Sequence, residues 1–177
     1  MYHYMETHPI SLTDRLVLEA DEMYLSQVNT YDNDSHSIPA HCIIGVVERG
    51  TSKVYLEAVK NRTTRTMSRI FNSVVPFPST IITDKWASYN FLDGNHKHLQ
   101  CEKHMAFSHS IEDPYDHIRF CGEKISMHTN TIEGFWSEFR ATIYWSWGWD
   151  VNYLKYILSE FMFRKAGYDL VVALQAR

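Results

Sequence analysis

Cysteine is scarce in this chain of 177 residues, which contains three, Cys42, Cys101 and Cys121, and no C-x-x-C pair. An odd number of widely spaced cysteines does not build the disulfide framework of a small secreted domain, and it fits a reducing compartment. Glycine (7 residues) and proline (5 residues) are also few, which excludes a collagen-like or linker-rich chain. We therefore expect an intracellular protein, in the nucleus if the host is a eukaryote.

Long apolar runs are absent as well. No stretch approaches the roughly 18 apolar residues that a membrane span needs. Residues 1–12 do not show the cationic stretch followed by an apolar one that marks a signal peptide. We expect no membrane among the partners. The length corresponds to one domain, and a chain of this size can bury roughly 70% of the surface that its unfolded form exposes.

Positive charge is in deficit, since 17 basic and 21 acidic residues leave a net charge of −4. The two signs are unevenly placed. Residues 1–36 contain one basic and seven acidic side chains, whereas residues 49–69 contain six basic ones and a single acid. The acidic segment could bind metal ions and the basic segment could bind phosphates. The simpler explanation is that both are charged surfaces in contact with solvent.

Hydrophobic periodicity predicts a mixed sheet with helices packed on its faces. Strands are expected at 15–25, 42–48, 53–59 and 80–84, with a weaker one at 99–103. Helices are expected at 63–75, from 130 to 143 and around 153–162, with a helical turn at 86–92. We divide the chain into a leader (1–14), one domain (15–166) with an irregular insertion at 107–127, and a tail (167–177).

Three acidic residues stand where apolar elements begin or end. Asp21 and Asp84 follow apolar strand residues, and Glu133 lies in the first turn of an aromatic-rich helix. If the strands are neighbours, three carboxylates meet and repel one another unless cations neutralise them. Oxygen ligands suit Mg²⁺ or Mn²⁺, and two such ions can promote phosphodiester cleavage. Each acid also has a structural explanation, as a turn former or, with Asn130 as N-cap, as part of a capping box.

The strings around these acids are more specific. Asp21-Glu22 follows a strand, and the other two acids lie in Thr83-Asp-Lys-Trp-Ala-Ser-Tyr89 and His128-Thr-Asn-Thr-Ile-Glu-Gly-Phe-Trp-Ser137. In this order the strings resemble the catalytic domain of insertion-sequence transposases of the ISXO type and of their eukaryotic relatives, the Merlin transposons. The resemblance covers residues 15–166.

The resemblance implies an α/β, ribonuclease-H-like mixed sheet flanked by helices. It also implies a DDE-type polynucleotidyl transferase that cleaves DNA at transposon ends and joins the freed 3′-hydroxyl to a target. Its catalytic residues and metal ligands would be Asp21, Asp84 and Glu133, holding two Mg²⁺ or Mn²⁺ ions, with Asn130 as the rival for the third place. Transposases of this mechanism act as multimers, so a homo-oligomer is expected.

Further residues are candidates for DNA contacts. Arg140 follows Glu133 by seven residues, so both share a helix face, and its guanidinium suits a DNA phosphate. His128 precedes this helix and is a candidate supporting residue. Lys60, Arg62 and Arg65 suit sequence-independent contacts to the DNA backbone.

Several departures from the family pattern favour an alternative. Arg140 replaces an expected lysine, and 48 residues separate Asp84 from Glu133, more than is usual. The family tends to be basic, and it usually has an end-reading segment before the catalytic domain, which is not seen here. The alternative is a catalytically inactive or domesticated domain that binds DNA or protein. A plain structure-selective nuclease with the same three acids is a third interpretation.

A histidine-rich segment is the other candidate metal site. His96, His98, Cys101 and His104 form an H-x-H-x₂-C-x₂-H pattern, and zinc accepts all of these ligand types. The spacing is not that of a zinc finger. A loop with surface histidines is therefore the competing interpretation.

Overall fold

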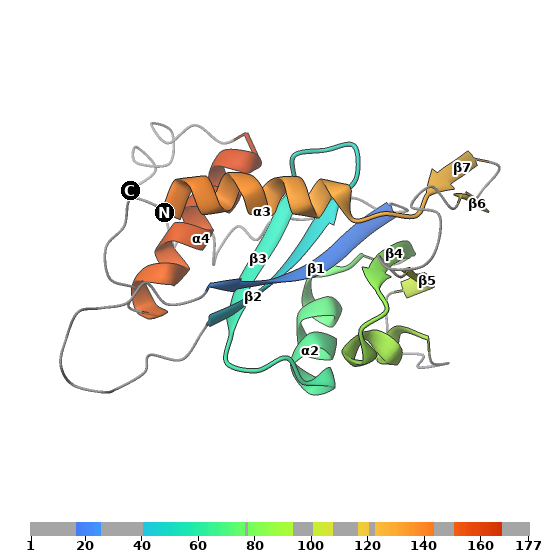
Figure 1. Ribbon diagram of the computed structural model, residues 1–177, viewed down its shortest axis with the longest axis horizontal. Coiled ribbons are helices and arrows are strands. Elements are labelled where there is room, and N and C mark those ends of the chain that lie inside the picture. The colour runs from blue at the N-terminus through green and yellow to red at the C-terminus, as the bar shows by residue number, and fades with distance from the viewer. Residues whose placement is uncertain are drawn as a thin grey trace.

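A five-stranded sheet forms the centre of the molecule (Figure 1). The structure is a computed structural model that describes residues 17–25, 41–76, 78–93, 101–107, 117–120, 123–143 and 151–167. The strands are β1 (Val17–Leu25), β2 (His41–Glu48), β3 (Val54–Val59), β4 (Ser79–Asp84) and β5 (Cys101–Phe107). Their spatial order is β3-β2-β1-β4-β5. The first three strands form an antiparallel meander, and β4 and β5 continue the sheet parallel to β1.

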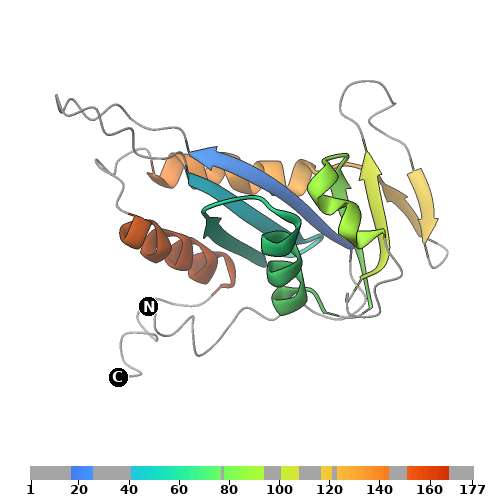
Figure 2. The ribbon, with the colours of Figure 1, turned by 90° about the horizontal axis from the view of Figure 1, so that it is seen from below.

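Helices cover both faces of this sheet (Figures 1 and 2). α3 (Asn130–Ile143) and α4 (Val151–Lys165) lie on one face, against β1, β2 and β3. α2 (Thr64–Val74) and the 3₁₀ helix η1 (Ala87–Leu92) lie together on the other. The expected α/β class, a ribonuclease-H-like mixed sheet flanked by helices, is confirmed. No helix in the described ranges is both long enough and apolar enough to cross a membrane.

The central strands are apolar because both of their faces are covered. Residues 42–47 of β2 are buried without interruption, and Leu18, Ala20, Ile81 and Ile82 of the neighbouring strands are fully buried. A strand buried on both faces has a nearly continuous apolar run instead of an alternating pattern. α2 buries Met67, Ile70 and Phe71, a helical spacing, and its N-cap Thr63 accepts a hydrogen bond from the backbone of Thr66.

Two expectations need correction. The weak strand expected at 99–103 is β5, which runs from Cys101 to Phe107. The segment 107–127 is not wholly irregular, because its described part contains an antiparallel hairpin of β6 (His117–Phe120) and β7 (Glu123–Ser126). Each strand has four residues, the shortest run in which an alternating pattern can be recognised, and the sequence analysis did not identify them. Residues 1–14 and 168–177, assigned to leader and tail, lie outside the described residues.

Candidate active site

Asp21 and Asp84 lie at the same level of two neighbouring parallel strands. The last pair of the β1–β4 ladder is Glu19 with Ile82. Two residues further along each strand stand Asp21 and Asp84, so this register puts both on one level and on one face of the sheet. Both side chains are partly buried. Because the pairing of β1 with β4 ends at Glu19 and Ile82, the two acids lie where the two strands are no longer hydrogen-bonded to each other.

The carboxyl group of Asp21 is held by α3. The indole Nε1 of Trp136 donates to Asp21 Oδ2 over 3.0 Å. Burial raises the pKa of Asp21 above its usual value, and the carboxylates of Asp84 and Glu133 add to this shift while the Trp136 hydrogen bond opposes it. Asp84 and Glu133 each therefore lie within electrostatic range of Asp21. Repulsion of this kind is what a bound cation relieves.

Asp84 is oriented by the turn that follows β4. Its Oδ1 accepts a hydrogen bond from the backbone N–H of Trp86 over 3.1 Å, which is an Asx turn. The neighbouring Thr83 hydroxyl lies 2.9 Å from His104 Nε2, and His104 Nδ1 lies 2.6 Å from Asp93 Oδ1. These contacts connect the end of β4 to β5 and to the end of η1. The Asp84 carboxyl is thus presented by a hydrogen-bonded turn.

Glu133 lies exposed in the first turn of α3. Its carboxylate Oε1 accepts a hydrogen bond from the Thr129 hydroxyl over 3.1 Å, and its backbone N–H donates to the Thr129 carbonyl over 3.0 Å. Thr129 is therefore the N-cap, and the expectation that Asn130 caps the helix is wrong by one residue. The physical reason is that Glu19 already supplies an acceptor to the first turn, at the N–H of Ile132. Asn130 is the exposed first residue of the helix.

The donor set suits a hard divalent cation, although the carboxylates do not converge on one point. Asp21, Asp84 and Glu133 offer only oxygen atoms, the ligands that Mg²⁺ and Mn²⁺ prefer. Among the described residues, no three His, Cys, Asp or Glu side chains are close enough together to hold an ion. The residues suit a divalent cation because they offer oxygen ligands, because Asp21 and Asp84 stand side by side on neighbouring strands, and because Asp84 and Glu133 repel Asp21.

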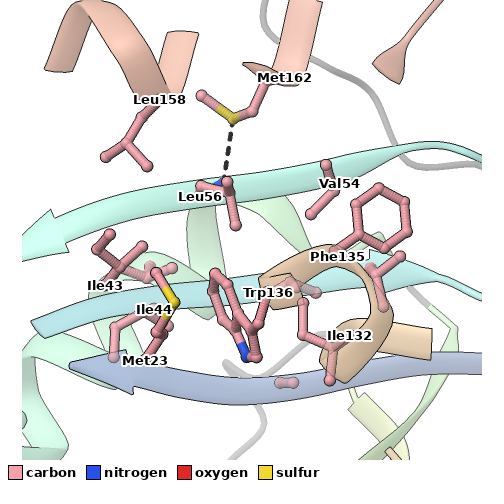
Figure 3. Close-up of a cluster of buried hydrophobic side chains, with 14 of the residues drawn as sticks. Met23, Ile43, Ile44, Val54, Leu56, Ile132, Phe135, Trp136, Leu158 and Met162 are labelled. Atoms are coloured by element: carbon pink, nitrogen blue, oxygen red, sulfur yellow. Dashed lines mark hydrogen bonds between the residues drawn. The ribbon is translucent and has the colours of Figure 1, made fainter. Parts of the chain in front are cut away.

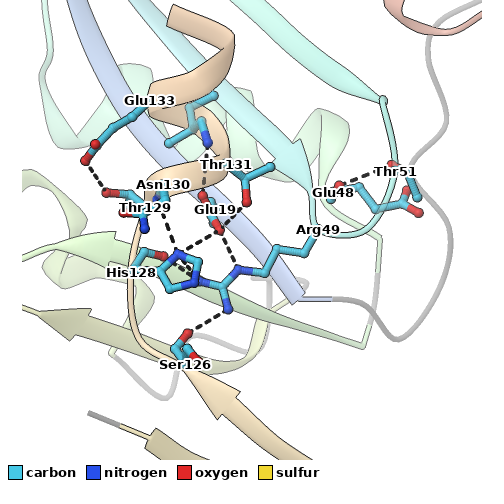
Figure 4. A network of polar contacts seen from close by, with 11 residues as sticks. Glu19, Glu48, Arg49, Thr51, Ser126, His128, Thr129, Asn130, Thr131 and Glu133 are labelled. Carbon is cyan, nitrogen blue, oxygen red and sulfur yellow. Dashed lines mark hydrogen bonds and ion pairs between the residues drawn. The ribbon is translucent and has the colours of Figure 1, made fainter. Parts of the chain in front are cut away.

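A buried carboxylate, Glu19, ties α3 to the sheet (Figure 4). Its side chain is fully buried. Glu19 Oε2 accepts from the backbone N–H of Ile132 over 3.0 Å, and Oε1 accepts from the Thr131 hydroxyl over 2.8 Å. A carboxylate at a helix N-terminus also interacts favourably with the helix dipole. Glu19 therefore anchors the turn of α3 that carries Glu133, and it stands two residues before Asp21 on the same face.

Arg49 neutralises Glu19 and extends this network. Its Nε donates to Glu19 Oε1, and its Nη1 donates to the carbonyl of Ser126 over 2.6 Å. Its Nη2 donates to the carbonyl of His128 and lies 3.2 Å from His128 Nδ1. Burial and the Arg49 charge lower the pKa of His128, so the ring is neutral at neutral pH. His128 Nδ1 also accepts from the N–H of Asn130, which makes His128 part of the loop that leads into α3.

Trp136 reaches Asp21 because β2 has no side chain beneath the indole (Figure 3). Asp21 pairs with Gly45 of β2, and a Cβ at Gly45 would lie 2.5 Å from Trp136 Cη2 and 2.9 Å from Ile132 Cδ1. Such contacts are far shorter than van der Waals distance. A glycine inside an apolar strand often marks a close approach of this kind. This was the one sequence signal that could have pointed to Trp136 and Gly45.

The basic residues expected to contact DNA are placed differently from one another. Lys60, Arg65 and Arg140 are exposed, and no described residue forms an ion pair with them. Arg62 is engaged inside the protein, where its Nη1 lies 3.7 Å from Glu22 Oε2. In the histidine-rich segment, His96 and His98 lie outside the described residues, while Cys101 and His104 lie on β5.

Glu22 gives a prediction for the pH dependence of stability. Burial raises the pKa of Glu22 from 4.5 to about 7, and the carboxylates of Asp84 and Asp21 add to the shift, while Tyr89 and Arg62 oppose it. Between these two pKa values the folded protein binds more protons than the unfolded chain, so stability falls as pH rises from about 4.5 to 7. Glu22→Gln should flatten this dependence by up to about 3 kcal/mol, the equivalent of the shift in pKa.

The measurement is urea unfolding of both proteins at pH 5 and pH 8 in EDTA. The wild type should lose stability between the two values relative to the Gln variant. Equal changes with pH in both proteins would contradict the assignment to Glu22.

The fold and the three acids together are the arrangement expected of a DDE-type transposase domain. The family model described as the ISXO2-like transposase domain matches residues 14–166. The chain therefore belongs to the ISXO2-like transposase family.

Two solved structures are also similar to this chain. One is described as the HTLV-2 integrase catalytic core domain in complex with magnesium, trimeric form, with 11% identity, a TM-score of 0.47, and coverage of 87% of this chain and 86% of that chain. The other is the dimeric form of the same complex, with 10% identity, a TM-score of 0.47 and 87% coverage of both chains. No curated protein matches this chain.

Proposed function

We propose that this chain is a DDE-type transposase domain that catalyses metal-dependent cleavage of a DNA phosphodiester and transfer of the freed strand. The observation that carries the proposal is the common level of Asp21 and Asp84 on neighbouring parallel strands, with Glu133 near enough to raise the pKa of Asp21. The family match supports the same function. The relation to Merlin transposons, a homo-oligomeric assembly, and the transposon ends and target as DNA partners belong to this proposal.

Each acid has a defined role in it. Asp21 and Asp84 would contact both Mg²⁺ or Mn²⁺ ions, and Glu133 would contact one. When bound, such ions activate the attacking oxygen and stabilise the leaving oxygen of the phosphodiester. The protein fixes the Asp21 carboxyl through Trp136 and the Asp84 carboxyl through the N–H of Trp86.

The exposed cations would bind the DNA backbone. Arg140 lies two helical turns beyond Glu133 on α3, and its exposed guanidinium can hold a phosphate beside the three acids. Lys60 precedes α2 and Arg65 lies on it, and both are exposed. Their contacts would be independent of sequence and weakened by salt.

The test is nicking of supercoiled plasmid at low salt, in Mg²⁺, in Mn²⁺ and in EDTA. The wild type should nick only with a divalent cation, and Asp84→Asn should reduce the rate at least about 100-fold, or about 2.7 kcal/mol in the barrier. Glu160→Gln, an acid that pairs with Arg164 on α4, is the matched control and should retain the wild-type rate.

Three results would overturn the proposal. Nicking that persists in EDTA, or in Asp84→Asn at the rate of the wild type, would show that the acids do not hold a catalytic cation. A wild type that nicks in neither metal would favour the inactive or domesticated alternative. Two observations favour that alternative: the net charge of −4, and the fact that the carboxylates of Asp21, Asp84 and Glu133 do not converge on one point.

A further inference from the structure

An aromatic and guanidinium cluster lies beside the candidate active site, and none of the assigned roles uses it. The guanidinium carbon of Arg62 lies 4.6 Å from the ring centroid of Tyr24 and 4.1 Å from that of Trp86. Tyr24 follows Asp21 by three residues on β1, and Trp86 follows Asp84 by two residues. Side chains alternate along a strand, so Tyr24 lies on the opposite face from Asp21. This is the face that carries α2 and η1.

The cluster is anchored at several points. The Glu22 carboxylate, whose side chain is 5% exposed, lies 3.7 Å from Arg62 Nη1. The Ser88 hydroxyl donates to the Arg62 carbonyl over 2.9 Å. The N–H of Trp86 donates to Asp84. Arg62 is therefore a fixed support for the two rings, and its expected contact to the DNA backbone stays a prediction.

Tyr24 is the exposed member of this cluster. Its side chain is 48% exposed. Among the large hydrophobic side chains of the described ranges, Tyr156 on α4 is more exposed, at 54%. A cation near a ring attracts it, so Arg62 holds the Tyr24 ring without covering all of it. A partly exposed aromatic ring that is held in place is a surface on which a nucleic-acid base can stack.

The charges around Tyr24 favour a base over a phosphate. Glu22, Asp21 and Asp84 place carboxylates near the cluster, and Arg62 is its basic member. A phosphate would be repelled by these acids, whereas an uncharged base would not. Three residues of strand span about 10 Å, which is about three steps along a DNA strand. Because Tyr24 and Asp21 lie on opposite faces of the sheet, a base on Tyr24 would belong to a nucleotide at least about three steps from the phosphate held at Asp21 and Asp84.

We propose that Tyr24, supported by Arg62 and Trp86, stacks on an unpaired DNA base a few nucleotides away from the cleavage position. The inference rests on the proposed function for the location of the cleaved phosphate. It adds a substrate preference, because a base must leave the duplex to reach the ring, and this costs least in a single strand or a frayed end.

Fluorescence anisotropy tests this proposal, with two labelled 20-nucleotide probes in low salt and EDTA. One probe is single-stranded mixed-sequence DNA, and the other is the blunt duplex of the same sequence. Tyr24→Ala should weaken binding of the single strand by about 5- to 150-fold, the range for the loss of one base–aromatic stack, and binding of the duplex by less than about twofold. Tyr24→Phe, which keeps the ring, should bind the single strand within about twofold of the wild type.

Tyr156→Ala is the matched control, since it removes an equally exposed tyrosine from α4, and it should bind like the wild type. Circular dichroism melting checks that the variants fold, and Tyr24→Leu replaces the Ala variant if that one does not. Equal weakening on both probes, unchanged binding of Tyr24→Ala, or a wild type that does not bind the single strand would overturn the inference.

The EDTA separates this result from catalysis. Tyr24-dependent binding in a protein that never nicks plasmid would overturn the proposed reaction and retain the stacking site. Nicking by a protein whose binding of the single strand does not depend on Tyr24 would support the proposed reaction and overturn the stacking site.

Discussion

Glu19→Ala should lower the free energy of unfolding by about 3–5 kcal/mol, the usual cost of removing one partner of a buried ion pair. The substitution leaves the partly buried Arg49 guanidinium without its carboxylate, and it leaves the N–H of Ile132 and the hydroxyl of Thr131 without their acceptor. The Ile132 N–H is buried and the Arg49 and Thr131 side chains are partly buried, so these groups regain partners from water only in part. Urea unfolding at neutral pH measures the change.

A double-mutant cycle separates the ion pair from the cost of an orphaned charge. Arg49→Met should also destabilise the folded protein, because it leaves the buried Glu19 carboxylate without its positively charged partner. The pair Glu19→Met with Arg49→Met should cost less than the sum of the two single changes, since no buried charge then remains. If Glu19→Ala costs less than about 1 kcal/mol, the network of Figure 4 does not hold the start of α3 in solution.

Gly45→Ala should destabilise the protein by about 1–3 kcal/mol, the range for overpacking a filled core, and should also impair nicking. The added carbon would lie 2.5 Å and 2.6 Å from two atoms of the Trp136 ring, so the indole has to move. The indole N–H is bonded to Asp21, so the same movement takes away the group that orients this carboxyl. Urea unfolding and the plasmid assay measure the two effects.

Two variants make this prediction specific. Trp136→Phe removes the two indole atoms that clash most closely, while the 2.9 Å contact with Ile132 Cδ1 remains, so Gly45→Ala should cost less in that background than alone. Gly134→Ala, on the same helix, would meet nothing within 4 Å and should instead stabilise the protein by about 0.5–1 kcal/mol, through helix propensity. An equal cost of Gly45→Ala with tryptophan or phenylalanine at 136 would contradict the contact between strand and indole.

The secondary structure was largely predictable because its signals are local. The strand expected at 42–48 is observed as His41–Glu48, and the helix expected at 63–75 is observed as Thr64–Val74. Uninterrupted apolar runs and helical spacing report how each segment is buried, and both can be counted from the sequence. The hairpin of β6 and β7 was not predicted, because each strand has only four residues and its pattern of polar and apolar residues is correspondingly weak.

The candidate site was predictable only for the residues that stand in recognisable strings. Asp21, Asp84 and Glu133 were selected because acids follow or begin apolar elements and because the strings around them resemble one family. Glu19 has the same charge and stands in the same strand as Asp21, yet its neighbours in sequence do not show that it is buried. Its partners are Arg49, Thr131 and Ile132, which come from distant parts of the chain.

The sequence by itself determined the types and order of the elements apart from the β6–β7 hairpin, the α/β class and the transposase family, because these depend on local periodicity and on short strings. Only the tertiary structure decided which charges are used inside the protein. It pairs Glu19 with Arg49, places the Trp136 indole over Gly45 and turns Arg62 toward Glu22 and two aromatic rings. The physical reason is that burial and pairing depend on which distant segments meet, and a local pattern holds no information on that meeting.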